Sequence, residues 1–94
     1  MLLPSRMAVL NYMSQVDCAS VNEVMDYLRP DYGSEAQFTY PLYLDHLMAL
    51  EANGYVSLLK YEVDQADNLV LTYEITEDGQ VAVEKYVPSK FRMA

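Results

Sequence analysis

The sequence predicts a single α+β domain in which three helices are followed by a β-hairpin and a short last helix. Apolar residues recur at helical spacing in the first half of the chain, then alternate over two short runs separated by a polar turn. The chain has 94 residues, 52% of them hydrophobic and 21% charged, which is enough for one modest core. No repeat, linker or low-complexity stretch interrupts it, so residues 1–94 are expected to form one domain.

The first helix is expected to follow Pro4, because a proline in the opening turn lacks only an N–H group that would be unpaired there. Apolar residues at helical spacing extend this helix to about Val16. They are Met7, Leu10, Met13 and Val16. Residues 1–4 are interpreted as an N-terminal extension.

The second helix is predicted from a capping box at residues 20–23, in which Ser20 and Glu23 satisfy each other's free backbone donors. The helix is expected to end near Arg29, because Pro30 disfavours helical geometry in the residue before it. A polar loop over residues 31–37 should follow. The inward positions of the helix are Val21, Val24, Met25 and Leu28.

The third helix is expected to begin after Thr39 as N-cap, with Pro41 in its first turn. Gly54 should end it, since glycine readily adopts the left-handed conformation found at helix C-termini. The buried face of this helix is predicted to consist of Tyr43, Leu47 and Leu50.

Two alternating runs, residues 55–63 and 69–75, predict the strands of a β-hairpin joined by a polar turn over residues 64–68. Thr76 can cap a last short helix that extends to about Tyr86. Residues 88–94 form a basic tail that begins at Pro88.

Two segments of this layout resemble a known superfamily. Residues 38–56 contain a Thr39 cap, apolar residues at Tyr43, Leu47 and Leu50, and Gly54 followed by the apolar pair Tyr55-Val56. This pattern resembles the recognition-helix segment of ArsR-, MarR- and PadR-type transcriptional regulators. The segment Tyr73-Glu74-Ile75-Thr76-Glu77-Asp78-Gly79 is similar to the one that closes the wing in PadR and MarR relatives. The chain thus resembles, over roughly residues 5–86, the winged helix-turn-helix superfamily in a minimal single-domain form. The resemblance implies three helices, a two-stranded wing and a short C-terminal helix, without the long extra helix of PadR and MarR proteins and without the cysteine pair of metal-sensing ArsR members.

The resemblance also implies a surface that would read DNA, and the charge of this chain argues against that use. Outward positions of the third helix would reach base edges, yet none is Arg or Lys, the usual partners of guanine and phosphate. The expected partner- or DNA-facing residues there are Thr39, Tyr40, Leu42, Asp45 and His46. The expected wing carries Lys60 against Glu62, Asp64 and Asp67.

The net charge of −8 reinforces this reading. Residues 1–84 hold all 14 acidic residues and only three of the six basic ones, whereas a DNA-binding surface needs several cations on one face. The other three cations form a basic C-terminal cluster away from the expected recognition helix. They are Lys85, Lys90 and Arg92.

Three functions therefore remain open. The first is a non-catalytic regulatory module or adaptor that acts mainly through protein–protein contacts, as a homodimer. The second is an operator-binding transcriptional regulator that reads DNA as a dimer, and the third is an acidic DNA mimic. A high tyrosine content, nine in 94 residues, suits a protein interface, because tyrosine buries a large ring and keeps a polar tip.

Enzymatic chemistry is not expected. His46 is the only histidine and is interpreted as an exposed polar helix residue, since no further metal ligand lies at a useful spacing. Cys18, the only cysteine, cannot form an internal disulfide and is predicted to be a small buried residue. No phosphate-binding loop or catalytic triad motif occurs, so no cofactor or metal is predicted. Without a secretion signal at the N-terminus or an apolar run of membrane-spanning length, a cytoplasmic location is expected.

Overall fold

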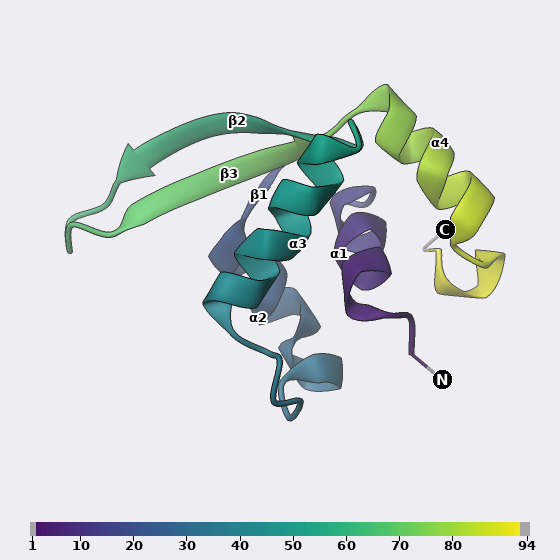
Figure 1. Ribbon diagram of the computed structural model, residues 1–94, viewed down its shortest axis with the longest axis horizontal. Coiled ribbons are helices and arrows are strands. Elements are labelled where there is room, and N and C mark those ends of the chain that lie inside the picture. The colour runs from purple at the N-terminus through teal and green to yellow at the C-terminus, as the bar shows by residue number, and fades with distance from the viewer. Residues whose placement is uncertain (1, 93–94) are drawn as a thin grey trace.

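The computed structural model describes residues 2–92, and within them the chain forms an α+β fold with four α-helices and one three-stranded antiparallel sheet (Figure 1). The class predicted from the sequence is confirmed. In chain order the elements are α1 (Ser5–Met13), β1 (Ala19–Ser20), α2 (Val21–Tyr32), α3 (Tyr40–Ala52), β2 (Val56–Val63), β3 (Leu69–Ile75), α4 (Glu77–Tyr86) and a short 3₁₀ helix (Ser89–Phe91).

The first three helices pack against one another, and the hairpin formed by β2 and β3 extends away from them (Figure 1). Helix α4 lies at the other end of the molecule, where it contacts α1. The fold therefore has a helical body, a protruding hairpin and a C-terminal segment opposite that hairpin.

The predicted helix starts are confirmed in atomic detail. The Ser20 side chain accepts a hydrogen bond from the Glu23 N–H, and the Glu23 carboxylate accepts one from the Ser20 N–H at 2.8 Å. Thr39 and Thr76 cap α3 and α4 through their hydroxyl oxygens. Gly54, with φ of 81°, adopts the left-handed conformation just after α3.

Two predicted helix ends are wrong. Helix α1 ends at Met13 rather than near Val16. Helix α2 continues through Pro30 to Tyr32 instead of ending near Arg29. The last turn of α2 is fixed by Tyr32, whose buried ring joins the core and whose hydroxyl donates to the Leu3 carbonyl oxygen at 2.5 Å. Tertiary contacts thus outweigh the local preference of a residue that precedes proline.

The sheet contains one strand more than predicted. The two-residue strand β1 pairs antiparallel with β3, Ala19 opposite Tyr73 and Ser20 opposite Thr72. Two residues are too few to show alternation in the sequence. The strand order is β1-β3-β2, so β2 lies at an edge of the sheet.

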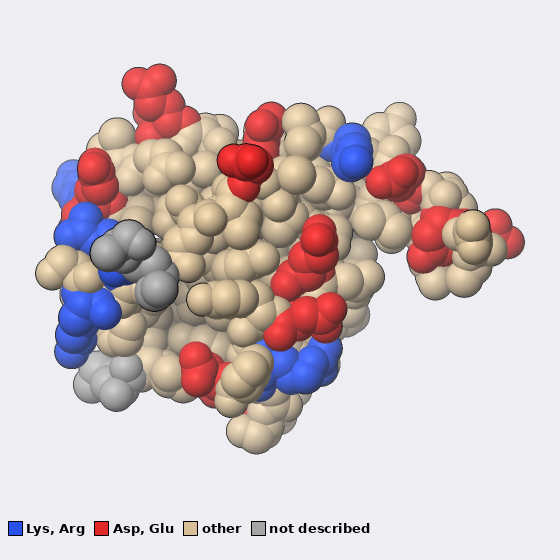
Figure 2. All heavy atoms as spheres, turned by 180° about the vertical axis from the view of Figure 1, so that it is seen from behind, with Lys and Arg blue, Asp and Glu red and all other residues tan. Residues whose placement is uncertain are grey.

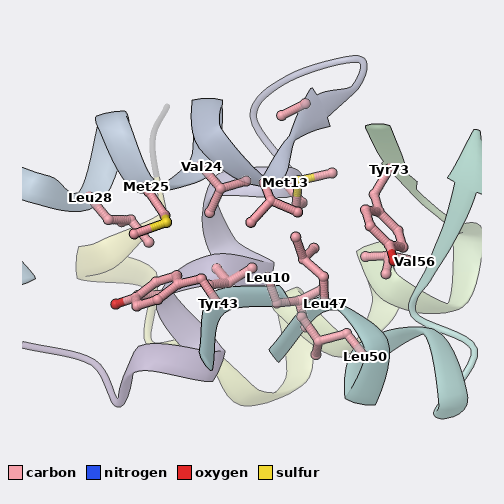
Figure 3. Packing of buried hydrophobic residues seen from close by; sticks show 14 of the residues in the cluster. Leu10, Met13, Val24, Met25, Leu28, Tyr43, Leu47, Leu50, Val56 and Tyr73 are labelled. Carbon is pink, nitrogen blue, oxygen red and sulfur yellow. The ribbon is translucent and has the colours of Figure 1, made fainter. Parts of the chain in front are cut away.

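The core lies between α1, α2, α3 and the base of the sheet (Figure 3). Leu10 and Met13 from α1, Val24 from α2 and Leu47 from α3 are fully buried. The inward positions predicted for α2 and α3 are confirmed, because Val21, Val24, Met25, Leu28, Tyr43, Leu47 and Leu50 are all buried.

Candidate interaction surfaces

The outer face of α3 is the first candidate surface. Thr39, Leu42 and Asp45 are exposed there, as predicted, whereas Tyr40 is half-buried. Met48, which was not among the residues predicted from the sequence, is 54% exposed and adds a second large apolar side chain to Leu42 on this helix. The surface is therefore apolar and acidic rather than basic.

Arg6 from α1 reaches the same face and was also missed. Its guanidinium Nη2 lies 3.6 Å from the Asp45 carboxylate, and its Nε donates to His46 Nδ1 at 3.2 Å. Forty residues separate these partners in the chain, so only the packing of α1 on α3 brings them together. Because Asp45 pairs with Arg6, the positive charge that Arg6 brings to this face is neutralised within the cluster Arg6–Asp45–His46.

His46 is half-buried in this cluster, so its interpretation as an exposed polar residue is wrong. Its ring packs edge-on against Tyr43, with ring centroids 5.1 Å apart. Burial, reinforced by the neighbouring Arg6 charge, lowers the pKa of His46 below its usual 6.5, although Asp45 opposes the shift. The lowered pKa favours the neutral imidazole, whose Nδ1 accepts the Arg6 hydrogen bond.

The hairpin is the second candidate surface and combines the predicted wing charges with exposed apolar residues. Lys60 lies 3.7 Å from Glu62, so the only hairpin cation is paired within its own strand. Asp64 Oδ1 accepts from the Ala66 and Asn68 N–H groups at 2.9 Å each, which shapes the tip. Asp67 has φ of 62°, a left-handed conformation that aspartate tolerates in turns. The large hydrophobic side chains exposed on the hairpin are Leu58, Leu59, Tyr61, Val63 and Leu69.

A groove with a volume of about 520 Å³ lies between the hairpin and the helices. Leu69 and Leu71 of β3 form one side of it, and Tyr40 and Leu44 of α3 form another. Asp64 and Asn68 from the tip, together with Asn22 of α2, complete the lining. The groove therefore lies between α3 and the hairpin, with Tyr40 of the first candidate surface and Asp64 and Leu69 of the second in its walls.

The C-terminal cluster of basic residues belongs to α4 and the segment after it, at the end of the molecule opposite the hairpin. Figure 2 shows Lys and Arg side chains gathered at the end of the molecule opposite the hairpin, while Asp and Glu side chains cover the hairpin tip. Lys85 lies in the last turn of α4, and its ammonium is 5.3 Å from the centre of the Tyr86 ring. Lys90 makes the same kind of contact with Phe91 at 5.2 Å, and Arg92 is half-buried. The cations at this end are thus separated from the acidic hairpin tip by the length of the molecule.

The tyrosines range from buried to exposed, and the cysteine is exposed. Tyr43 is buried as predicted, and Tyr32 and Tyr73 are buried as well, whereas Tyr12 and Tyr55 are only half-buried. Exposed rings remain at Tyr27, Tyr61 and Tyr86. Cys18 is exposed rather than buried, because it lies in the short segment between α1 and β1, outside both elements.

Residues 2–92 contain no cluster of three or more His, Cys, Asp or Glu side chains that could hold a metal ion. Over the same residues, every helix is too short or too polar to cross a lipid bilayer. A second hollow of about 150 Å³ between α1, α2 and Phe91 has mostly apolar walls.

Comparison with known proteins yields no relative for this chain: no protein-family model, no curated protein and no solved structure matches it.

Proposed function

We propose that this protein is a winged-helix module that acts through protein–protein contacts and not as an enzyme. The fold part of the proposal is supported by the element order α1-β1-α2-α3-β2-β3 and the protruding hairpin. In this interpretation α2 and α3 form the helix-turn-helix, and β2 and β3 form the wing. The short strand β1 joins the base of the wing to the helices.

The observation that carries the functional part is the composition of the side formed by α3 and the hairpin. In a DNA-binding winged helix this side would present cations to phosphate oxygens. Here both basic side chains on it, Arg6 and Lys60, are paired with carboxylates. The exposed residues around them are apolar or acidic, including Leu42, Met48 and Tyr61. Such a side suits an apolar protein surface bordered by basic residues.

The test compares cross-linked protein partners of the wild type with those of surface variants in extracts of the source cells. L42D and M48D, combined, place charges at the centre of the proposed surface, and V81D on α4 is the matched control on another exposed apolar residue. We expect the double variant to lose partners that both the wild type and V81D retain. Partners that survive the double variant but are lost in V81D would contradict the proposal.

Operator binding by a dimer is the second candidate, because the C-terminal cluster supplies three cations at one end of the molecule. It predicts that a fluorescent mixed-sequence duplex binds at low salt, that binding weakens steeply as salt rises, and that K85A or R92A weakens it further. The first proposal predicts no anisotropy change under these conditions. DNA binding lost in K85A and R92A would reverse the order of the two candidates.

A further inference from the structure

Strand β2 has an open edge. In the strand order β1-β3-β2 the inner side of β2 pairs with β3, and within residues 2–92 no strand covers its outer side. The side chains along it are unusually exposed for apolar residues, with Tyr61 at 71% and Val63 at 64% of full exposure. Open edge strands with apolar side chains readily pair with further strands.

The turn geometry shows which backbone groups point outward. The Asp64 N–H donates to the Asn68 carbonyl oxygen at 2.9 Å, so this pair closes the hairpin. In an antiparallel ladder, hydrogen-bonded and non-hydrogen-bonded pairs alternate. With Val63 opposite Leu69 and Tyr61 opposite Leu71, the N–H and C=O groups of Val63 and Tyr61 face the open edge.

We propose that this edge binds a second copy of the chain, β2 against β2 in antiparallel orientation about a two-fold axis at Tyr61. In this register Lys60 of each copy lies opposite Glu62 of the other, and the two Tyr61 residues lie opposite each other. Residues directly opposite in an antiparallel pair share a face and lie close enough to form ion pairs. The strand is therefore complementary to itself in charge as well as in hydrogen bonding.

Neighbouring registers lack this complementarity. An axis at Lys60 places two ammonium groups opposite each other, and an axis at Glu62 does the same with two carboxylates.

Because the hairpin extends away from the helices (Figure 1), the two helical bodies would lie at opposite ends of the paired hairpins. The pairing goes beyond the proposed function, because it requires neither a different protein nor DNA. It also leaves Leu42 and Met48 of α3 free.

The test is the solution mass of the purified chain across protein concentration, by sedimentation equilibrium. The wild type is expected to shift from 10.8 kDa to twice that mass as the protein concentration rises. K60E or E62K places like charges opposite each other at two symmetric positions, so each should weaken the dimer on the order of tenfold. The double variant K60E/E62K exchanges the two charges and should restore wild-type affinity.

K85E is the matched control, because it makes the same charge change as K60E on α4, and it should leave the dimer unchanged. Circular dichroism melting confirms that each variant is folded. The proposal is overturned if the wild type stays monomeric to millimolar concentration, or if K60E and E62K dimerise as the wild type does. It is also overturned if the double variant remains as weak as the single ones, or if K85E alone dissociates the dimer.

Discussion

His46 lies where α1 and α3 meet, and its surroundings disfavour the protonated ring. Burial is the main cause of its lowered pKa, and the Arg6 guanidinium adds to it. A proton on Nδ1 would also remove the acceptor that Arg6 uses. The same residue that looked like an isolated polar side chain in the sequence therefore links two helices.

This arrangement predicts a pH-dependent stability. The unfolded chain binds a proton near the ordinary histidine pKa of 6.5, and the folded chain binds it only at lower pH. The stability that neutral His46 provides is complete above pH 6.5 and is lost as pH falls through the lower, folded pKa. Urea midpoints between pH 7.5 and 5.5 should therefore fall more steeply for the wild type than for H46Q. An NMR titration that places the His46 pKa at or above 6.5 would contradict this prediction.

Gly79 occupies a position with no room for a side chain. A Cβ atom there would lie 2.1 Å from the Tyr55 carbonyl oxygen and 2.6 Å from Ile75 Cγ1. The residue lies in the first turn of α4, where its N–H donates to the Thr76 hydroxyl at 3.0 Å. Glycine at this point lets α4 approach the end of α3 and the base of the hairpin.

G79A should therefore destabilise the fold by about 1–3 kcal/mol, the usual cost of overpacking, despite the better helix propensity of alanine. Chemical denaturation measures the change. Q80A is the control, since Gln80 is exposed on the same helix and its substitution should alter stability little. Equal stability of G79A and Q80A would show that α4 can shift to accept the methyl group.

At the scale of the elements, Thr76 joins three parts of the chain. Its hydroxyl donates to the Gly54 carbonyl oxygen at 2.6 Å and accepts the Gly79 N–H, and its N–H donates to the Tyr55 carbonyl oxygen at 2.9 Å. The end of α3, the start of β2 and the start of α4 meet at this one side chain.

T76A removes the N-cap of α4 and leaves the Gly54 carbonyl without its donor, so we expect a loss of about 1–2 kcal/mol in the free energy of unfolding. T76S keeps the hydroxyl and should recover most of it. Guanidinium melts of the three proteins test the prediction. If T76S is as unstable as T76A, the lost methyl group, and not the lost cap, accounts for the effect.

Elements with strong local signals could be predicted from the sequence, and those that depend on distant partners could not. Three helix starts are predicted by N-cap residues whose side chains bond only three residues ahead. These residues are Ser20, with Glu23 as its capping-box partner, Thr39 and Thr76. The hairpin follows from two alternating runs. Strand β1, in contrast, exists because Ala19 and Ser20 meet Tyr73 and Thr72, more than fifty positions away.

The same distinction applies to the candidate surfaces. Leu42, Asp45 and the charges of the hairpin could be assigned from helical and strand periodicity. Arg6 could not, because its place beside Asp45 and His46 depends on how α1 packs across α3. Pro30 within α2 is a similar case, since the contacts of Tyr32 decide where that helix ends.

At the scale of the whole molecule, repulsion among the excess acidic residues destabilises the folded state. The chain carries a net charge of −8 within extents of 40 × 31 × 23 Å. Only three ion pairs offset it among residues 2–92, and all lie at the surface, where such pairs contribute little. Unfolding relieves this repulsion by moving the carboxylates apart.

Salt should therefore stabilise the folded protein. At 10 mM ionic strength the screening length is about 30 Å, so charges across the molecule repel one another, and at 150 mM it is about 8 Å, which confines repulsion to neighbours. We expect the melting temperature at pH 7 to rise between these two salt concentrations, measured at a protein concentration where the chain is monomeric. Near the sequence pI of about 4.3 the net charge vanishes and the same salt step should have little effect. A melting temperature that falls with salt at pH 7 would mean that the surface ion pairs stabilise the fold more than the acidic excess weakens it.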